Sequence, residues 1–316
     1  MAITGSGTQE DPYLVHNYTE LKNPYPFVGS GTRYVKLAND INCNDYGTAF
    51  EWETIQWYQN SQGNTTKLDL DGHTIKNVPL KSGNQMFVLK AYSSAYDEIY
   101  NGKLRNIFTQ PSSAAYVIEG SVLSNSITDV SMSVSLGLNS KGVFKNINPL
   151  RCSLYVETGG TPQDGEAMIL YSTIDASSSA LCKLSNCDIK VINNNMLNHI
   201  TWTNNGNIGL NPLIDNCRIQ GKIKTSGLLS GWISRGKLLN SVIDLDMSEA
   251  SFGSMSYSGK WSCEDGSSGV INVDNQPSNQ QYEVYFTRGM AGVTSSEIIN
   301  GEALRAKGFT VINVSG

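Results

Sequence analysis

The sequence predicts an all-β fold, a right-handed parallel β-helix in which short strands stack along one axis. Three observations support this fold class: a polar, turn-rich composition, a short motif that recurs along the chain, and segments in which apolar and polar residues alternate. Charged residues make up 16% of the 316 residues, and Asn and Ser together contribute 68 residues. This composition is typical of many short strands joined by turns.

The same composition excludes several classes of protein. The formal net charge is −5, with only 23 Lys and Arg residues, so a nucleic-acid-binding surface is not expected. No apolar run approaches the roughly 18 residues of a membrane span, and no membrane insertion is expected. The first five residues, Met1 to Gly5, lack the basic and apolar regions of a secretory signal. We therefore expect a protein that is made and used without export.

A motif of an apolar residue, any residue and then Asn occurs seven times. Its Asn residues are 29, 19, 21, 40, 30 and 24 residues apart, and the interval of 40 is interpreted as two steps with a degraded copy at 166–173. We expect each Asn at a fixed corner of its coil, where Asn tolerates the left-handed backbone region and can stack its amide on the next Asn. The seven are Asn77, Asn106, Asn125, Asn146, Asn186, Asn216 and Asn240.

Short alternating segments follow the motif, as at 187–191, 217–223 and 242–247. Alternation with period two predicts strands with one buried face. In four copies the residue directly after the Asn is small and is expected to face inward; these residues are Ser126, Cys187, Cys217 and Ser241. An antiparallel sandwich or barrel is the alternative, but hairpin turns every 8–12 residues are not evident.

Three regions are expected along the chain. Residues 1–60 form an N-terminal cap or attachment region, 61–255 the parallel β-helix, and 256–316 a C-terminal cap or oligomerisation module, because the end coils of a solenoid need covering. In the first region we expect a short helix at 19–22, a strand at 34–41, and an aromatic plug ahead of coils that begin at Lys67. That plug would consist of Trp52, Ile55, Trp57 and Tyr58.

The last region is expected to hold a strand at 282–286, a helix at 295–307 and a strand at 309–312. The six cysteines contain no C-x-x-C pair, so we expect buried thiols and no zinc site. No cofactor is expected. The three histidines have no partners at ligand spacing, and His73 is interpreted as a turn residue that bridges to the first coil.

The segment from Gly5 to Val15 resembles the opening of β-helical surface proteins and phage proteins of gut bacteria. The resemblance continues at Lys36–Ile41, at Trp52–Ile55, at the turn Asp71–Ile75 and at Thr294–Phe309. It covers the first 80 and the last 25 residues, and it implies the β-helical fold with its cap. Together with the missing secretory signal, it favours a phage appendage, such as a tail spike, a receptor-binding protein or a head fibre.

A depolymerase on this scaffold would need two carboxylates beside a sugar bond, or a basic catalyst with acidic calcium ligands. Candidate carboxylates two residues apart on one strand face are Asp164 with Glu166, Asp244 with Asp246, and Glu51 with Glu53. Each pair is more simply explained as a solvated outer face.

Tyr and Trp residues suit sugar faces and interfaces. The candidates for exposed, glycan-binding aromatics are Tyr92, Tyr96, Tyr100, Trp202 and Trp232, although cap and interface packing would explain them too.

The first functional hypothesis is a non-enzymatic virion protein, a homotrimer that contacts other virion proteins and binds host cell-surface polysaccharide by multivalency. It would reside in the virion after assembly in the host cytoplasm. The alternatives are a polysaccharide depolymerase on the same fold and an adhesin on the bacterial cell surface. Fold alone does not separate the three.

Overall fold

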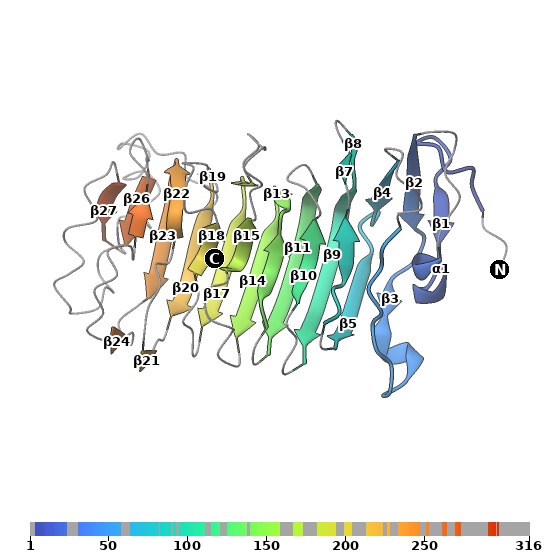
Figure 1. The fold of residues 1–316 in the computed structure, drawn as a ribbon, viewed down its shortest axis with the longest axis horizontal. Helices are drawn as coiled ribbons and strands as arrows, with labels where there is room; N and C mark the ends of the chain where they lie inside the picture. Colours follow the sequence, from blue (N-terminus) through green and yellow to red (C-terminus); the bar gives the residue numbers. More distant parts are fainter. Residues whose placement is uncertain are drawn as a thin grey trace.

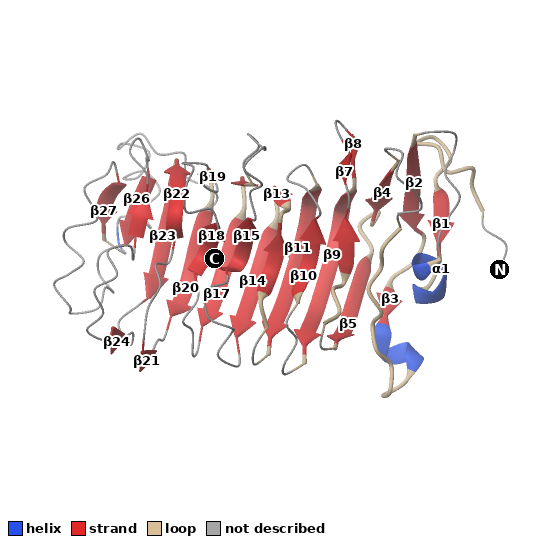
Figure 2. Ribbon diagram, viewed as in Figure 1, coloured by secondary structure: helices blue, strands red, loops and turns tan. Residues whose placement is uncertain are grey.

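The computed structural model of the 316-residue chain consists mostly of β-strands (Figure 2). The described residues are 4–23, 31–57, 64–81, 83–89, 91–92, 95–110, 115–120, 125–137, 140–158, 167–172, 182–193, 199–203, 213–223, 226–227, 233–246, 251–252, 261–263, 269–272, 290–294 and 296. Within them, 23 strands are joined in one hydrogen-bonded sheet in which the pairings between strands are parallel. The strands lie side by side along the long axis of the molecule (Figure 1). This arrangement is consistent with a β-solenoid.

Three ladders of strands run through this sheet. The long-strand ladder contains β3 (Ile41–Asn42), β5 (Thr74–Leu80), β9 (Glu98–Thr109), β11 (Ser126–Leu136), β14 (Ser153–Thr158), β17 (Asp188–Asn193), β20 (Arg218–Ile223), β23 (Ser241–Asp246), β26 (Gly269–Asn272) and β27 (Met290–Val293). The short-strand ladder contains β1 (Tyr13–Val15), β2 (Thr32–Leu37), β4 (Thr65–Asp69), the first parts of β9 and β11, β13 (Asn148–Leu150), β16 (Lys183–Ser185), β19 (Leu213–Asp215) and the end of β22 (Ile233–Leu239).

The opposite ladder contains β6 (Phe87–Leu89), β10 (Tyr116–Gly120), β12 (Gly142–Lys145), β15 (Ala167–Ser172), β18 (His199–Thr203), the start of β22 and β25 (Trp261–Cys263). Smaller elements are the antiparallel pair β7 (Ala91–Tyr92) and β8 (Ala95–Tyr96), the parallel pair β21 (Ser226–Gly227) and β24 (Ser251–Phe252), and two short helices near the N-terminus, α1 (Tyr18–Lys22) and η1 (Cys43–Tyr46).

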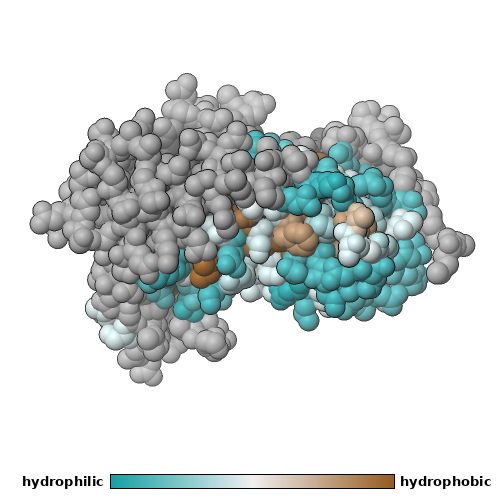
Figure 3. Space-filling view, turned by 90° about the horizontal axis from the view of Figure 1, so that it is seen from below, coloured by the Kyte–Doolittle hydropathy of each residue, from teal (hydrophilic) through white to brown (hydrophobic). Residues whose placement is uncertain are grey.

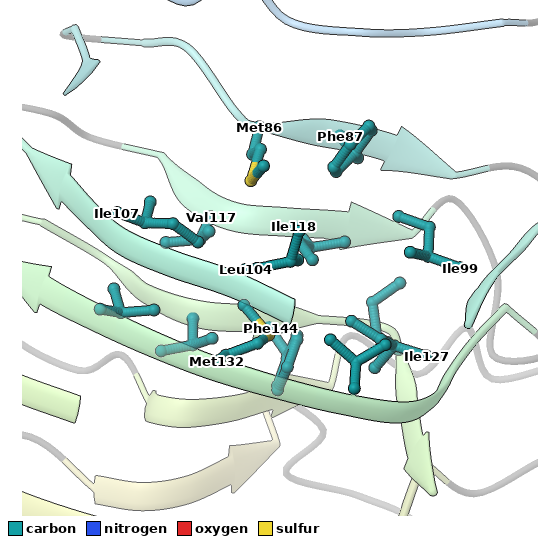
Figure 4. Packing of buried hydrophobic residues seen from close by; sticks show 14 of the residues in the cluster. Met86, Phe87, Ile99, Leu104, Ile107, Val117, Ile118, Ile127, Met132 and Phe144 are labelled. Carbon is teal, nitrogen blue, oxygen red and sulfur yellow. The ribbon is translucent and has the colours of Figure 1, made fainter. Parts of the chain in front are cut away.

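The core lies between the long-strand ladder and the opposite ladder. Leu104 and Ile107 of β9 face Phe87 of β6 and Ile118 of β10 across this space (Figure 4). Each of these side chains is fully buried. Alternation with period two therefore places one row of apolar residues from every strand in a continuous stacked core.

A coil is the stretch of chain between a residue and its register partner in the next strand of the same ladder. Coil lengths vary: Ser131 pairs with Ser153, Ser153 with Asp188, Asp188 with Arg218, and Arg218 with Val242. The chain from Cys152 to Cys187 is therefore a single coil, and the expected degraded copy at 166–173 is wrong. That segment overlaps β15, which belongs to the opposite ladder of the same coil.

The corner prediction is confirmed in backbone conformation for six of the seven asparagines, which have φ between 48° and 59°. The prediction of one fixed corner is wrong. Asn186, Asn216 and Asn240 share a corner between the short-strand and long-strand ladders, whereas Asn77 and Asn106 stack within the long-strand ladder. Two amide ladders form, with Nδ2 of Asn106 donating to Oδ1 of Asn77 over 2.6 Å and Asn216 donating likewise to Asn186.

Asn125 is the exception among the seven asparagines, because its φ is not in the positive range. It is fully buried, and its amide donates to the carbonyl oxygen of Leu89 and accepts a hydrogen bond from the backbone N–H of Asp97. The motif therefore does not specify one structural position, because Asn77 and Asn106 lie inside strands whereas Asn186, Asn216 and Asn240 lie between strands.

Small residues do face inward at the shared corner. Cys152, Cys187, Cys217 and Ser241 occupy successive coils there, all of them buried. The backbone N–H of Cys217 donates to Oγ of Ser241 over 3.2 Å. Ser126, by contrast, lies in the short-strand ladder. The buried-thiol prediction is confirmed for Cys43, Cys152, Cys182, Cys187 and Cys217.

In the N-terminal region the short helix and the buried aromatic residues agree with the sequence prediction. Helix α1 begins after Asn17, whose side chain accepts a hydrogen bond from the backbone N–H of Glu20, and it ends before Pro24. Trp52, Ile55 and Trp57 are buried as expected, while Tyr58 lies outside the described residues. Parallel pairing begins at Tyr13, which is earlier than the expected start at Lys67.

The opening segment caps the first strand. Gly5 and Gly7 have φ values of +90° and +79°, and a Cβ at Gly5 would lie 2.1 Å from the carbonyl oxygen of Pro12. The backbone N–H groups of Ser6 and Gly7 both donate to the carbonyl oxygen of Asp11. The glycines of this segment are thus required by a tight turn. At the other end, the predicted strands at 282–286 and 309–312 lie outside the described residues, as does all but residue 296 of the predicted helix at 295–307.

Candidate functional site

The outer face of the long-strand ladder carries a regular array of polar side chains. In β11, β14, β17 and β20 the inward residues are apolar, for example Leu154 and Ile189, and the outward residues are polar. Ser133, Tyr155, Lys190 and Gln220 pair in register across the four strands. Parallel stacking thus aligns one outward residue from each coil into a row about 4.8 Å apart.

Two adjacent depressions lie on this face, and together we call them the groove. Their volumes are about 330 and 390 Å³, and both are lined by Ser131 and Ser153. The first is also lined by Arg105, Met132, Ser133, Leu154, Tyr155, Asp188, Lys190 and Gln220. The second is also lined by Gly72, Asn101, Gly102, Lys103, Asp129, Val130 and Arg151.

Several groove side chains are held in place by their neighbours. Nη2 of Arg105 donates to Oγ of Ser131 over 2.7 Å, and Nε2 of Gln220 donates to Oδ1 of Asp188 over 3.1 Å. Arg151 makes two hydrogen bonds to the carboxylate of Asp129, of 2.7 and 2.6 Å. These bonds lower the pKa of Asp129, so this carboxylate stays ionised and occupied by its partner.

Tyr155 is the exposed aromatic of the groove, with 37% of its surface accessible. Its hydroxyl donates to Oε2 of Glu157 over 3.3 Å. Partial burial and the Glu157 carboxylate raise the pKa of Tyr155, so the phenol stays neutral. A neutral, partly exposed ring among hydroxyl, amide and cationic groups can stack on an apolar face and donate or accept hydrogen bonds.

Asp244 and Asp246 both lie on β23, where their side chains occupy the outer face, next to the groove. The register places Asp244 opposite Gln220 and Asp246 opposite Lys222. Asp244 is 3.6 Å from Nη2 of Arg218, and Asp246 is 3.8 Å from Nζ of Lys222. Each carboxylate therefore faces a cation of the preceding coil.

The other candidate carboxylates fall elsewhere. Asp164 and Glu166 lie outside the described residues. Glu51 pairs with Lys81, and Glu53 pairs with Lys22, so both take part in ion pairs of the N-terminal region. Neither Glu51 nor Glu53 lines the groove.

Of the candidate aromatics, Tyr96 is the one whose exposed ring is described. It is 37% exposed, and Nζ of Lys67 lies 3.6 Å from its ring centroid, a cation–π contact that occupies one face. Tyr92 lies in β7 and Trp202 in β18, but their side chains are not among those described, and Trp232 lies outside the described residues. Tyr100 is half-buried, and burial together with Asp69 raises its pKa to about 12.

His73 bridges two coils, as expected. Its Nδ1 lies 3.2 Å from Oδ1 of Asp40, which also accepts a hydrogen bond from the backbone N–H of Thr74. Nδ1 of His16 lies 3.0 Å from Oε2 of Glu20, four residues further along the chain. Over the part of the chain that is described, no three His, Cys, Asp or Glu side chains come together as a metal site would need, and no helix has the length and apolarity to cross a membrane.

The sequence interpretation did not single out Arg105, Tyr155 or Lys190. Each was visible as the polar member of an alternating segment, but nothing in a single strand shows which outward residues from other coils lie beside it. Seen from below the view of Figure 1, the described surface is mainly hydrophilic (Figure 3). A polar outer residue is therefore common, and only the register identifies the groove.

Comparisons with known proteins inform the fold alone. No family model and no curated protein sequence matches the chain. Among solved structures, the chain is similar to a protein from Bacteroides ovatus described as a "putative immunoglobulin A1 protease". The TM-score is 0.51 and the identity 11%, over 94% of this chain and 88% of that one. The likeness supports a mostly β fold built on parallel sheets.

Proposed function

We propose that this protein binds a surface polysaccharide in the groove without cleaving it. The observation that carries the proposal is the groove itself, an outer-face depression in which an exposed Tyr155 lies in register with Ser133, Lys190 and Gln220. Sugars present hydroxyl groups at their edges and C–H groups on their faces. The polar side chains match the first, and the tyrosine ring matches the second.

The geometry favours binding over hydrolysis. A glycosidase needs a carboxylic acid whose pKa is raised, so that it can protonate the leaving oxygen. In the groove, the pKa of Asp129 is lowered by Arg151, and Asp188 accepts a hydrogen bond from Gln220. Asp244 and Asp246, beside the groove, face Arg218 and Lys222. Each of these four carboxylates therefore already has a hydrogen-bond or ion-pair partner, which suits binding.

We place this binder on a phage virion, in a tail appendage, receptor-binding protein or head fibre, assembled in the host cytoplasm. The support is the resemblance of residues 5–15 and 36–41 to β-helical phage and surface proteins. In this proposal the parallel ladders form a closed, right-handed β-helix, and residues 256–316 form a module that joins three copies and contacts other virion proteins. The three grooves of one trimer would together compensate for the weak binding of each single groove through avidity. An adhesin on the bacterial cell surface is the alternative setting.

Binding can be tested on an array of immobilised bacterial polysaccharides, both neutral and acidic, with the purified chain. We expect saturable binding to a subset, weakened about tenfold or more by Tyr155→Ala, because loss of a stacking ring costs about 1–3 kcal/mol. Tyr96→Ala is the matched control, since Tyr96 is equally exposed but lies outside the groove lining. Absence of any binding, or equal loss in both variants, would overturn the proposal. Release of oligosaccharides would show cleavage instead.

The setting needs a separate measurement. Mass spectrometry of purified virions should detect the chain, and light scattering should give the mass of three copies. Detection only in bacterial surface fractions would favour the adhesin.

A further inference from the structure

We propose that the groove selects acidic polysaccharides, which carry carboxylate, sulfate or phosphate groups; this inference rests on the proposed function. The observation behind it is a local reversal of charge. The chain as a whole has a formal net charge of −5. The groove, however, is lined by four cationic residues and two carboxylates, namely Lys103, Arg105, Arg151 and Lys190 against Asp129 and Asp188.

The two carboxylates do not cancel the surplus. Asp129 is held by both guanidinium hydrogen bonds of Arg151. Asp188 accepts a hydrogen bond from the neutral amide of Gln220. Among the described residues, Lys103, Arg105 and Lys190 have no carboxylate at ion-pair distance. These three cations therefore exceed the remaining negative charge of Asp188 by two.

The surplus cations flank the tyrosine. Arg105 lies on β9, Tyr155 on β14 and Lys190 on β17, with β11 between β9 and β14. Three strand spacings separate Arg105 from Lys190, which amounts to about 14 Å along the stack. Cations at both ends of this distance, with a ring and serine hydroxyls between them, suit a chain that carries acidic groups at intervals rather than a single small anion.

Arg105 is preorganised for this role. Its guanidinium is anchored through Nη2 to Ser131, which leaves the remaining N–H groups to bind an oxyanion. The same chemistry binds carboxylates, sulfates and phosphates, so the structure assigns the class of ligand by charge and leaves the acidic group to experiment. A long polyphosphate such as single-stranded DNA is disfavoured because the rest of the chain is acidic.

The test uses a polysaccharide that the array shows to be bound, together with a version whose carboxyl groups have been reduced, or whose sulfate or phosphate groups have been removed. We expect binding to fall at least tenfold for the neutralised version and to weaken as NaCl rises. Arg105→Gln and Lys190→Gln should each weaken binding of the acidic form about tenfold, because a charge-assisted contact is lost, and should weaken binding of the neutralised form much less.

The matched control is Lys183→Gln, which removes one positive charge from a residue of the short-strand ladder that pairs with Asp215. Circular dichroism would confirm that all variants fold. Equal binding of the acidic and neutralised forms, or capture of neutral polysaccharides only, would overturn the acidic preference and leave glycan binding intact. Capture of no polysaccharide would remove the proposed function itself. Equal affinity for single-stranded DNA through the same residues would overturn the polysaccharide assignment.

Discussion

The N-terminal end of the molecule and its middle are stabilised by different means. At the end, Trp52 packs against the rings of Tyr18 and Phe87 with centroid distances of 4.7 and 6.0 Å, and its Nε1 donates to the carbonyl oxygen of Met86. In the middle, the inward residues are repeated aliphatic side chains such as Leu154, Ile189 and Ile219. The end is stabilised by aromatic side chains that make specific contacts, and the middle by stacked aliphatic side chains.

The end also contains a buried charge. Arg33 is fully buried, with Nε donating to Oγ1 of Thr66 and Nη2 to the carbonyl oxygen of Trp57. Asp97, also buried, accepts a hydrogen bond from the backbone N–H of Thr66 over 2.6 Å. Burial lowers the pKa of Arg33 to about 10, and the charge of Asp97 opposes this shift.

The difference follows from position in the stack. A middle coil has a neighbour on each side, so its strands pair and its apolar side chains are covered by similar residues of the next coils. The first coil has a neighbour on one side only, and its open end must be filled by side chains that are placed individually. We therefore expect the stability of the N-terminal end to depend on individual side-chain contacts, and that of the middle to depend on how closely the backbones of successive coils can stack.

The largest change in the free energy of unfolding is expected when the buried Arg33 loses the charge of Asp97. Asp97→Ala should lower the free energy of unfolding by about 3–5 kcal/mol, because it leaves Arg33 buried without its counter-charge. Urea denaturation, with hydrogen exchange to locate the loss in the N-terminal coils, measures this. Asp97→Asn keeps an acceptor for Thr66 and removes the charge. A loss below about 1 kcal/mol in both variants would show that the charge of Asp97 is unimportant.

Backbone fit in the middle can be broken at Gly221. Its φ is +131°, and a Cβ there would lie 1.9 Å from the carbonyl oxygen of Val191 in the preceding coil. Gly221→Ala should therefore cost about 2–4 kcal/mol, since strain adds to the steric clash. Gly72→Ala is the control, because Gly72 also has a positive φ of +75° but has open space around it, and it should cost about 1 kcal/mol. Equal costs would argue that close stacking does not limit this position.

The asparagine corner tests the contribution of side-chain ladders. Asn216 has φ 52°, and its Nδ2 donates to Oδ1 of Asn186 over 2.6 Å. Asn216→Ala should cost about 1–2 kcal/mol, because it loses both the tolerance of the left-handed region and one hydrogen bond. Asn216→Gly restores the backbone freedom and should recover part of the loss in a thermal melt. No difference between the two variants would mean that the backbone conformation contributes little.

The smallest change in stability is expected when the pH is lowered, and it should involve carboxylates of both the end and the middle. Hydrogen bonds from Thr74 and His73 lower the pKa of Asp40 at the end, and Arg151 lowers that of Asp129 in the middle, each from an ordinary value of 3.8. A lowered pKa in the folded state contributes stability that is present above the ordinary value and lost as pH falls through the folded one. The urea midpoint should thus be flat above about pH 5 and fall below about pH 4.

Asp40→Asn and Asp129→Asn should each reduce this dependence on pH. An unchanged slope in both variants would assign the acid effect to other carboxyl groups.

Parts of the fold were predictable because they depend on local chemistry. The alternation at 187–191 and 217–223 predicts β17 and β20, and the short helix expected at 19–22 corresponds to α1 (Tyr18–Lys22). The asparagine motif correctly predicts a left-handed backbone at six of its seven copies, since φ is a property of one residue and its neighbours. It does not predict which corner, because coils of 22 to 35 residues, as between Ser131, Ser153 and Asp188, place similar motifs on different ladders.

The candidate site was less predictable. The sequence directed attention to Asp244 with Asp246 and to Tyr96, where like residues lie close together along the chain. The groove instead combines Arg105, Tyr155 and Lys190 from three different coils.

By itself, the sequence determined that this chain forms short strands with left-handed corners and buried thiols. These features follow from the period of apolar residues and from the conformational freedom of Asn and Gly. Only the tertiary structure decided which coils stack in which register, and therefore which outward side chains become neighbours. The physical reason is that parallel strands of different coils pair through backbone hydrogen bonds, which are the same for every residue. Register is set by packing of the whole core, and the charge of the groove follows from the register.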